Sequence, residues 1–340
     1  MKNTILTGVR VNGELTLGNF LGAIFPIVQL AAKHADEYNV NIFVPDLHTI
    51  IAEVDGKLHE NTMKSIKYYM ATGLDTKHPN IHVYRQSYIP AHSELTWILD
   101  CFATMGETSR MIQYKEKSDG GKESANVGIF NYPILMAADI LLYSAKYVPV
   151  GEDQFQHLEL TRDIALRMNK KFGEIFVPPA PSREQVEFMS LDEGLRIRDL
   201  VHPEKKMSKS SRNENAKIML SDRPEAAAKK IMSATTDSVG KIQFDMFNQA
   251  GISNLLQILS LLKREPLQDV IARWTGESSY GDLKQEVAVA LKHFLQDFQE
   301  KVAEISDKTV LEVLEEGEAR MRKVADAKLL EVQKAVGIRR

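Results

Sequence analysis

The 340-residue sequence contains a single cysteine, Cys101. One cysteine excludes an intrachain disulfide and fits a protein of the reducing cytosol. Long apolar runs are scarce too: residues 15–32 are uncharged, but they include Gly18, Asn19 and Pro26. Polar groups and helix breakers of this kind indicate a buried helix rather than a membrane span. We therefore expect a cytoplasmic protein with no membrane contact and, from its length, two domains.

Several motifs of nucleotide and metal chemistry are missing. The sequence has no Gly-x4-Gly-Lys-Ser/Thr, no Gly-x-Gly-x-x-Gly after the first predicted strand, no Cys-x-x-Cys and no His-Glu-x-x-His. These absences argue against a P-loop, a dinucleotide fingerprint and a built-in zinc site. The formal net charge is only −3, so a nucleic-acid partner would have to bind a local basic patch.

What is present is an alternation of strand and helix patterns over the first 200 residues. This alternation predicts an α/β fold, a doubly wound parallel sheet of the Rossmann-like type. After Pro224 the strand patterns stop, and apolar residues recur at helical spacing from Leu283 to Ile305. We expect a catalytic domain over 1–215 and a helical domain over 216–340, with the final helix a candidate to pack back on the first domain. The predicted strands are Thr4–Val9, Val40–Val44, Ile81–Gln86, Tyr147–Val150 and Glu187–Met189, and the predicted helices are Gly18–His34, His59–Thr72, His92–Met105 and Gln154–Asn169.

The stretch TGVRVNGELTLGNFLG, residues 7–22, is the first candidate ligand site. A strand ends near Val9, and a helix opens near Gly18 after a glycine-containing loop. The N-terminus of such a helix offers free N–H groups and the positive end of the helix dipole. Thr16 and Asn19 add neutral hydrogen-bonding groups. Taken alone, the stretch is explained equally well by a ligand site and by glycines that only permit close packing of a helix against a strand.

The heptapeptide KKMSKSS, residues 205–211, is the second candidate. A run of this kind is more often a solvated surface loop than a binding site. If a nucleotide lies at the helix that opens near Gly18, however, Lys206 and Lys209 can reach its phosphates together with the hydroxyls of Ser208 and Ser210.

Both strings carry a resemblance to a known family. KMSKS at 206–210 is the second signature of class I aminoacyl-tRNA synthetases, and TLGN at 16–19 resembles the tryptophanyl form of their first signature. Further segments are similar to tryptophanyl-tRNA synthetases: PDLHTI (45–50), NYPILMAADILLY (131–143), VPVGEDQFQHLELTRDIALRMN (148–169) and RIRDLVHPEKKMSKS (196–210). The resemblance covers Thr4 to about Ser211. It implies a tryptophan–tRNA ligase, which forms tryptophanyl-adenylate from L-tryptophan and ATP and passes the acyl group to tRNA(Trp).

The resemblance also implies a tryptophan pocket. Asp139 would accept the indole N–H, although a salt-bridged core acid is the simpler interpretation of a carboxylate in an apolar helix. An acceptor that phenylalanine leaves unpaired would penalise that analogue. Met136 would pack on the ring, with core filling as its alternative. The other implied pocket residues are Tyr132 and Gln154 at the α-ammonium group, Gly8, and His48, for which a hydrogen-bonded interior histidine is the alternative.

The implied chemistry needs no general base, because the tryptophan carboxylate is already ionised when it attacks the α-phosphorus. Pyrophosphate then leaves with the developing negative charge. Lys209 is the first candidate to neutralise that charge and Lys206 the second, with Mg²⁺ assisting. Thr16 and Asn19 complete the implied catalytic set. The implied ATP contacts are Gly18, Asn19, Lys206, Met207, Ser208, Lys209 and Ser210, together with Gly151 and Asp153 at the ribose, Ile197 at the adenine, and Arg10 at the carboxylate or a phosphate.

The family resemblance further implies a homodimer, with an interface inserted at about 85–130, and a helical domain that reads the anticodon. Three alternatives stay open from the residues alone. A tyrosyl-tRNA synthetase shares the fold and the lysine loop. A small-molecule nucleotidyltransferase shares the sheet type, and a non-catalytic paralogue would bind tryptophan or RNA as a regulator.

Overall fold

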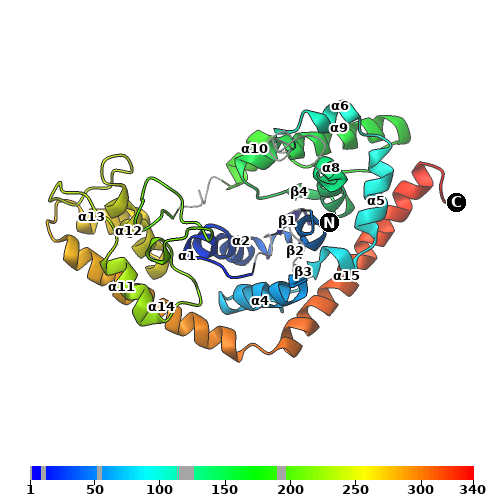
Figure 1. Ribbon diagram of the computed structural model, residues 1–340. Helices are drawn as coiled ribbons and strands as arrows, with labels where there is room; N and C mark the ends of the chain where they lie inside the picture. The colour runs from blue at the N-terminus through cyan, green and yellow to red at the C-terminus, as the bar shows by residue number, and fades with distance from the viewer. Residues whose placement is uncertain (1, 9–12, 52–55, 113, 115–125, 190–196) are drawn as a thin grey trace.

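The computed structural model describes residues 2–8, 13–51, 56–112, 114, 126–189 and 197–340. Within these ranges, a parallel sheet has the strand order β3-β2-β1-β4 (Figure 1). Thr4 of β1 lies opposite Asn39 of β2, and Val40 of β2 lies opposite Ile81 of β3. The parallel sheet and the all-helical final third confirm the predicted fold class. The strands are β1 (Thr4–Gly8), β2 (Asn39–Val44), β3 (Ile81–Arg85) and β4 (Ala145–Tyr147).

Helices cover both faces of the sheet because successive strand residues point to opposite sides. Ile5 and Val83 belong to one buried cluster with α2 and α4, whereas Leu6 and Tyr84 belong to a second one with α5, α8 and α9. Among the described residues before position 200, the α-helices are α1 (Leu17–Asn19), α2 (Phe25–His34), α3 (Asp46–Thr49), α4 (Leu58–Ala71), α5 (Ala91–Asp100), α6 (Met105–Ser109), α8 (Val127–Leu142), α9 (Phe155–Phe172) and α10 (Ser182–Met189).

The predicted strand Glu187–Met189 is wrong, because these residues end helix α10. A short apolar run does not distinguish a strand from a buried helical turn. Arg183 and Glu187, one turn apart, form an ion pair at 2.9 Å. Phe188 stacks on Tyr147 with ring centroids 3.9 Å apart, so tertiary packing against β4 holds this helix in place.

The predicted helix Gly18–His34 is interrupted. Between α1 and α2 the chain makes a π-helical turn, Phe20–Ile24. Pro26, in the first turn of α2, has no amide hydrogen for a regular i→i−4 bond and so favours the wider turn. The predicted helix His92–Met105 is likewise two helices, because Thr104 starts α6 with a reciprocal capping box to Glu107.

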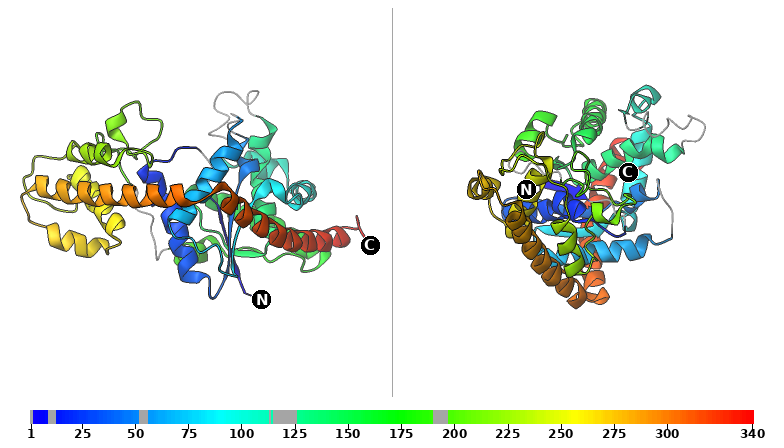
Figure 2. Two further views of the ribbon diagram at one scale, coloured as in Figure 1. Left: turned by 90° about the horizontal axis from the view of Figure 1, so that it is seen from below. Right: turned by 60° about the vertical axis from the view of Figure 1, so that its left-hand side comes forward.

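The last third of the chain is helical and contains α11 (Pro224–Met232), α12 (Ala250–Lys263), α13 (Leu267–Trp274), α14 (Tyr280–Glu304) and α15 (Asp307–Ala335). The predicted apolar stripe lies on α14, where Leu283, Val287 and Leu291 are fully buried. α14 and α15 run end to end along one side of the molecule (Figure 2). In the described part of the chain, no helix combines the length and apolar character needed to cross a bilayer.

Helix α15 closes the β3 edge of the sheet at very short range. A Cβ atom placed on Gly317 would stand 1.9 Å from the Val83 carbonyl oxygen. The next residue, Glu318, is buried and accepts hydrogen bonds from Arg85 Nε at 2.5 Å and Nη2 at 3.0 Å. This bidentate pair satisfies both charges away from water and fixes the register of α15 against the sheet.

We expect Gly317→Ala to destabilise the protein by about 1–3 kcal/mol, because the methyl group would push α15 off a strand backbone that cannot rotate away. The measurement is thermal or urea unfolding. Gly281→Ala on α14 is the matched control, since its Cβ would meet nothing closer than the Ser279 Oγ at 4.0 Å. That control should be neutral or slightly stabilising; equal effects of the two variants would refute the close-contact explanation.

Candidate active site

The two predicted signature stretches are joined through the backbone. Leu17 N–H donates to the Ile218 carbonyl at 2.8 Å, and Leu220 N–H donates to the Leu15 carbonyl at 3.0 Å. Thr16 and Met219 form the antiparallel bridge between these bonds. The segment that follows the lysine loop therefore pairs with the opening of α1, which brings residues some 200 positions apart to one place.

Thr16 and Asn19 hold each other at the start of α1. The Asn19 amide donates to Thr16 Oγ1 at 3.1 Å, and Thr16 Oγ1 donates to Asn19 Oδ1 at 2.9 Å. This reciprocal cap fixes the first helical turn. Gly18 lies inside that turn, where a Cβ would meet Met207 Cβ at 3.2 Å and Ile197 Cβ at 3.5 Å. A side chain at 18 would thus press on the lysine loop.

The lysine loop, Lys206–Ser210, is anchored at its first half. Met207 is buried, and its amide donates to the Ile197 carbonyl at 3.0 Å. Lys206 forms an isolated antiparallel bridge with Arg198. Ser208 and Ser210 share a hydroxyl contact at 2.9 Å and remain exposed. The loop therefore presents polar side chains to the surface from a backbone tied to the core.

Lys209 points toward the loop that precedes α1. Its ammonium would lie 3.6 Å from a Cβ placed on Gly13. Burial raises the pKa of the adjacent Glu14. Hydrogen bonds from Lys64 and Ser221, together with the charges of Lys64 and Lys209, lower this pKa by more, so that it lies below its ordinary value and the carboxylate stays ionised. Positive charge thus gathers beside the first signature. The predicted contact Arg10 lies outside the described residues.

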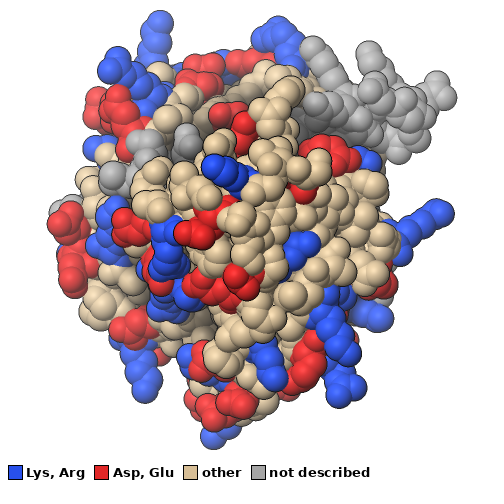
Figure 3. Space-filling view, turned by 90° about the vertical axis from the view of Figure 1, so that its left-hand side faces the viewer, with Lys and Arg blue, Asp and Glu red and all other residues tan. Residues whose placement is uncertain are grey.

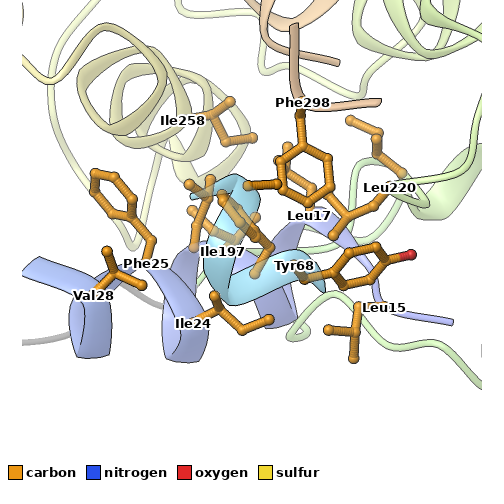
Figure 4. Close-up of a cluster of buried hydrophobic side chains, with 14 of the residues drawn as sticks. Leu15, Leu17, Ile24, Phe25, Val28, Tyr68, Ile197, Leu220, Ile258 and Phe298 are labelled. Atoms are coloured by element: carbon orange, nitrogen blue, oxygen red, sulfur yellow. The ribbon is translucent and has the colours of Figure 1, made fainter. Parts of the chain in front are cut away.

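A shared apolar cluster supports this junction (Figure 4). Leu15 and Leu17 from the first signature meet Ile197 and Leu220, which flank the lysine loop, in one buried cluster with residues of the final helices. Phe298 of α14 reaches Phe20 at a centroid distance of 5.2 Å. The helical part of the chain therefore packs directly beneath the signature stretches.

Asp139 on α8 is almost fully buried and has three hydrogen-bond partners. Gln86 Nε2 donates to its Oδ1 at 2.7 Å, His92 Nδ1 lies 2.6 Å from the same oxygen, and His48 Nε2 lies 2.9 Å from Oδ2. Burial raises the pKa of Asp139, but the hydrogen bonds and charges of the two histidines outweigh it, and the pKa lies below its ordinary value. The carboxylate is therefore ionised, and Oδ2 can accept one further donor.

Tyr132, two turns before Asp139 on the same face of α8, begins a second polar chain. Its hydroxyl lies 3.1 Å from His157 Nε2, and His157 Nδ1 lies 2.8 Å from Gln154 Oε1. Gln154 Nε2 donates to Asp153 at 2.7 Å. The Tyr132 ring also meets His48 edge-on at 6.2 Å, so the two polar groups adjoin each other at the carboxyl edge of the sheet, where ligands bind in such folds.

The remaining predicted pocket residues lie around these groups. Gly8 ends β1, where a Cβ would stand 2.5 Å from the Phe43 carbonyl oxygen. Met136 is partly buried and packs against the second core cluster. Gly151 precedes the 3₁₀ turn Glu152–Gln154, with Asp153 exposed on it. In the described part of the chain, no group of three acidic, histidine or cysteine side chains is arranged to hold a metal ion.

Sequence analysis missed Gln86 and His92 as partners of Asp139. Gln86 comes directly after β3, and His92 lies in the first turn of α5, the next α-helix along the chain. Their position at or beyond the carboxyl end of a predicted strand could have marked them as candidates, because ligands bind at that edge of an open α/β sheet. Nothing in the sequence pairs them with an acid some 50 positions later.

These features match a known family. The tRNA synthetases class I (W and Y) match residues 1–296 of the chain. The chain belongs to this family. The predicted resemblance to a class I aminoacyl-tRNA synthetase, and with it the enzyme class of ligase, is thereby confirmed.

Full-length relatives in this synthetase family are tryptophan–tRNA ligases by name. One from Caldanaerobacter subterraneus subsp. tengcongensis is 45% identical over 98% of this chain and 98% of its own, and one from Bacillus subtilis is 40% identical over 100% and 99%. Among solved structures, tryptophanyl-tRNA synthetase from Mycoplasma pneumoniae has a TM-score of 0.79 at 34% identity, covering 99% of this chain and 98% of that one. The Campylobacter jejuni enzyme complexed with ADP and tryptophan has a TM-score of 0.77 at 30% identity, covering 98% and 99%.

Proposed function

We propose that this synthetase is a tryptophan–tRNA ligase that forms tryptophanyl-adenylate from L-tryptophan and ATP and then charges tRNA(Trp). The observation that carries the choice of amino acid is Asp139. It is buried, ionised and fixed by three donors, with acceptor capacity left on Oδ2. An indole N–H is the donor that such a group would select, since phenylalanine offers none. On the same helix, Met136 would pack on the indole ring, and Tyr132 would contact the α-ammonium group.

The reaction in this site is one of placement and charge. The tryptophan carboxylate attacks the α-phosphorus in line, the bond to the β-phosphate bridging oxygen breaks, and pyrophosphate leaves with the electron pair. Lys209, directed at the loop before α1, neutralises the leaving group, and Lys206 assists. Gln154 would hold the α-ammonium, and Asp153 and Gly151 the ribose. The Ile197 backbone would meet the adenine edge.

Magnesium fits this site as part of the substrate. The described residues offer no acidic cluster for it, and Mg²⁺ is commonly bound through substrate phosphates. It would arrive with ATP and lessen the phosphate charge, while Lys206, Lys209 and the serine hydroxyls of the loop hold the same phosphates from the protein side. Thr16 and Asn19, already paired with each other, would keep the α1 N-terminus open to the nucleotide.

The transfer RNA would reach the helical domain, for which we keep the predicted limits 216–340. On the face that contains α12 and α13, lysine and arginine side chains are interspersed with acidic ones (Figure 3). Charge alone therefore does not mark the anticodon surface on the described part of that face. The predicted cytoplasmic location is that of the translation machinery.

We also propose that the chain forms a homodimer through the surface of α5, α6 and the start of α8. Large apolar side chains are exposed there, with Trp97 73%, Met105 74% and Val127 80% accessible. Beside them lies an open groove of about 510 Å³ that includes Ile50, Ile51 and Leu135. An apolar surface next to a groove is typical of an interface between subunits.

Replacing Trp97 with glutamate should convert the dimer into a monomer, because a carboxylate cannot be buried unpaired in that surface. Light scattering coupled to gel filtration gives the mass directly. The control is Phe247→Glu, since Phe247 is 93% exposed in the helical part and lies outside the proposed interface. A wild-type chain that elutes as a monomer at micromolar concentration would refute the proposed interface.

Amino-acid-dependent exchange of pyrophosphate into ATP tests the function itself. We expect exchange with tryptophan and a far lower kcat/KM with tyrosine and phenylalanine. Charging of tRNA(Trp) should follow in the same preparation. Exchange with tyrosine alone would overturn the assignment, and no exchange with any amino acid would favour a non-catalytic paralogue.

A further inference from the structure

Lys217 has contacts unlike those of a surface lysine. It lies seven residues after the signature loop and is only 8% exposed. Its ammonium donates to the Lys209 carbonyl at 3.1 Å and to the Ser211 carbonyl at 2.9 Å. The carboxylate of Glu214, itself exposed, lies 2.9 Å away. A buried ammonium thus spans the second half of the loop.

The backbone around Lys217 is held as firmly as its side chain. Lys230 on α11 donates to the Lys217 carbonyl at 3.1 Å and pairs with Asp222 at 2.6 Å. The residues that follow Lys217 are the ones that pair with Leu15–Leu17 through the Ile218 carbonyl and the Leu220 amide. Lys217 is therefore fixed to the first signature by its backbone and to the second by its side chain.

The two halves of the loop are secured in different ways. Backbone bonds and the buried Met207 hold the first half against Ile197. The second half, from Ser208 to Ser211, is mostly exposed and turns through the Ser211 amide to the Ser208 carbonyl at 3.2 Å. Within the described contacts of this half, the Lys217 ammonium ties the Lys209 peptide to the body of the protein.

We propose that Lys217 is a positioning residue for adenylate formation: its ammonium fixes the Lys209 and Ser211 carbonyls and so aims the Lys209 side chain at the leaving phosphates of ATP. This rests on the role proposed above for Lys209. Because the carbonyls accept hydrogen bonds and Lys217 supplies up to three, the contact orients the loop without placing the Lys217 charge on the substrate. A shift of the Lys209 backbone would misplace its ammonium, to which such reactions are sensitive.

The test compares Lys217→Met, which keeps the length of the side chain and removes the donors, with Glu214→Gln, which removes only the exposed partner carboxylate. In pyrophosphate exchange we expect Lys217→Met to lower kcat by about tenfold or more and to leave the KM for tryptophan unchanged. Glu214→Gln should stay within about twofold of the wild type. Lys217→Arg should recover part of the lost rate, since it keeps a cationic donor.

A double-mutant cycle separates positioning through Lys209 from a general structural effect. In a Lys209→Ala background, Lys217→Met should cause little further loss of kcat, because the side chain that it aims is gone. Additive losses, or an unchanged kcat in Lys217→Met, would overturn the proposal. If Lys217→Met fails to fold, Lys217→Gln and the arginine variant are compared in the same cycle. Failure of the Lys209 role itself is distinguishable, since Lys209→Ala alone would then keep full exchange activity.

Discussion

Substitution of Lys209 by alanine is expected to lower the kcat of adenylate formation by about 100- to 1,000-fold, with little change in the KM for tryptophan. The loss of one charged donor at a developing oxyanion typically costs this much. The Lys209 ammonium lies at the loop before α1, where its positive charge helps to lower the pKa of Glu14. Pre-steady-state quench of the first turnover measures the chemical step without interference from product release.

Two neighbouring lysines provide the comparison for this result. Lys206→Ala should cost less than Lys209→Ala, because Lys206 is the second candidate for the leaving group. Lys205→Ala alters an exposed lysine next to the loop and should be nearly silent. If all three variants lose the same modest factor, the loop acts only through its general charge and not through a placed ammonium.

The second large effect is expected for Asp139→Asn. An indole N–H donating to an ionised acceptor is worth about 1.5–3 kcal/mol, so the KM for tryptophan should rise by about 10- to 100-fold. The kcat/KM for phenylalanine should change far less, because phenylalanine has no donor for this group. The ratio of the two kcat/KM values in pyrophosphate exchange is therefore the decisive readout.

Asp139→Asn also places an amide among three donors, Gln86, His48 and His92. Part of the effect will therefore be a lower midpoint of thermal unfolding, which a melting curve of the free enzyme separates from the loss of binding. The matched control is Asp163→Asn on the neighbouring helix α9, where the acid is exposed. An unchanged tryptophan-to-phenylalanine ratio in Asp139→Asn would show that the acid is only a structural part of the core.

Local patterns predicted the sheet well because each strand has a period that one segment can reveal. β1, β2 and β3 lie within a residue or two of their predicted limits, whereas β4 (Ala145–Tyr147) shares only Tyr147 with the predicted strand Tyr147–Val150. The strand predicted at Glu187–Met189 failed because its helix depends on Phe188 stacking on Tyr147, a contact between segments 41 positions apart. The periodicity of one segment cannot reveal a contact with a distant segment.

In the candidate site, too, contacts within one segment differ from contacts between distant segments in how far the sequence reveals them. Thr16 and Asn19 pair within one helical turn, at a spacing visible in the sequence, although the sequence analysis predicted them only as hydrogen-bonding groups for a ligand. The bonds of Gln86 and His92 to Asp139, of Lys217 to the loop backbone, and of Glu318 to Arg85 join side chains whose relation only the folded chain creates. Glu318 is the extreme case, 233 positions from its partner. The motifs pointed to candidate ligand-binding residues, but they did not identify the side chains that hold those residues in place.

The closure of the β3 edge by α15 bears on biosynthesis of the protein. Gly317 and Glu318, which seal that edge, are translated after all four strands, and Glu318 follows its partner Arg85 of β3 by 233 positions. Until they emerge from the ribosome, the nascent chain keeps an uncovered strand edge, a form prone to pairing with other chains. Premature termination before α15 should therefore yield an aggregating fragment rather than a working catalytic half.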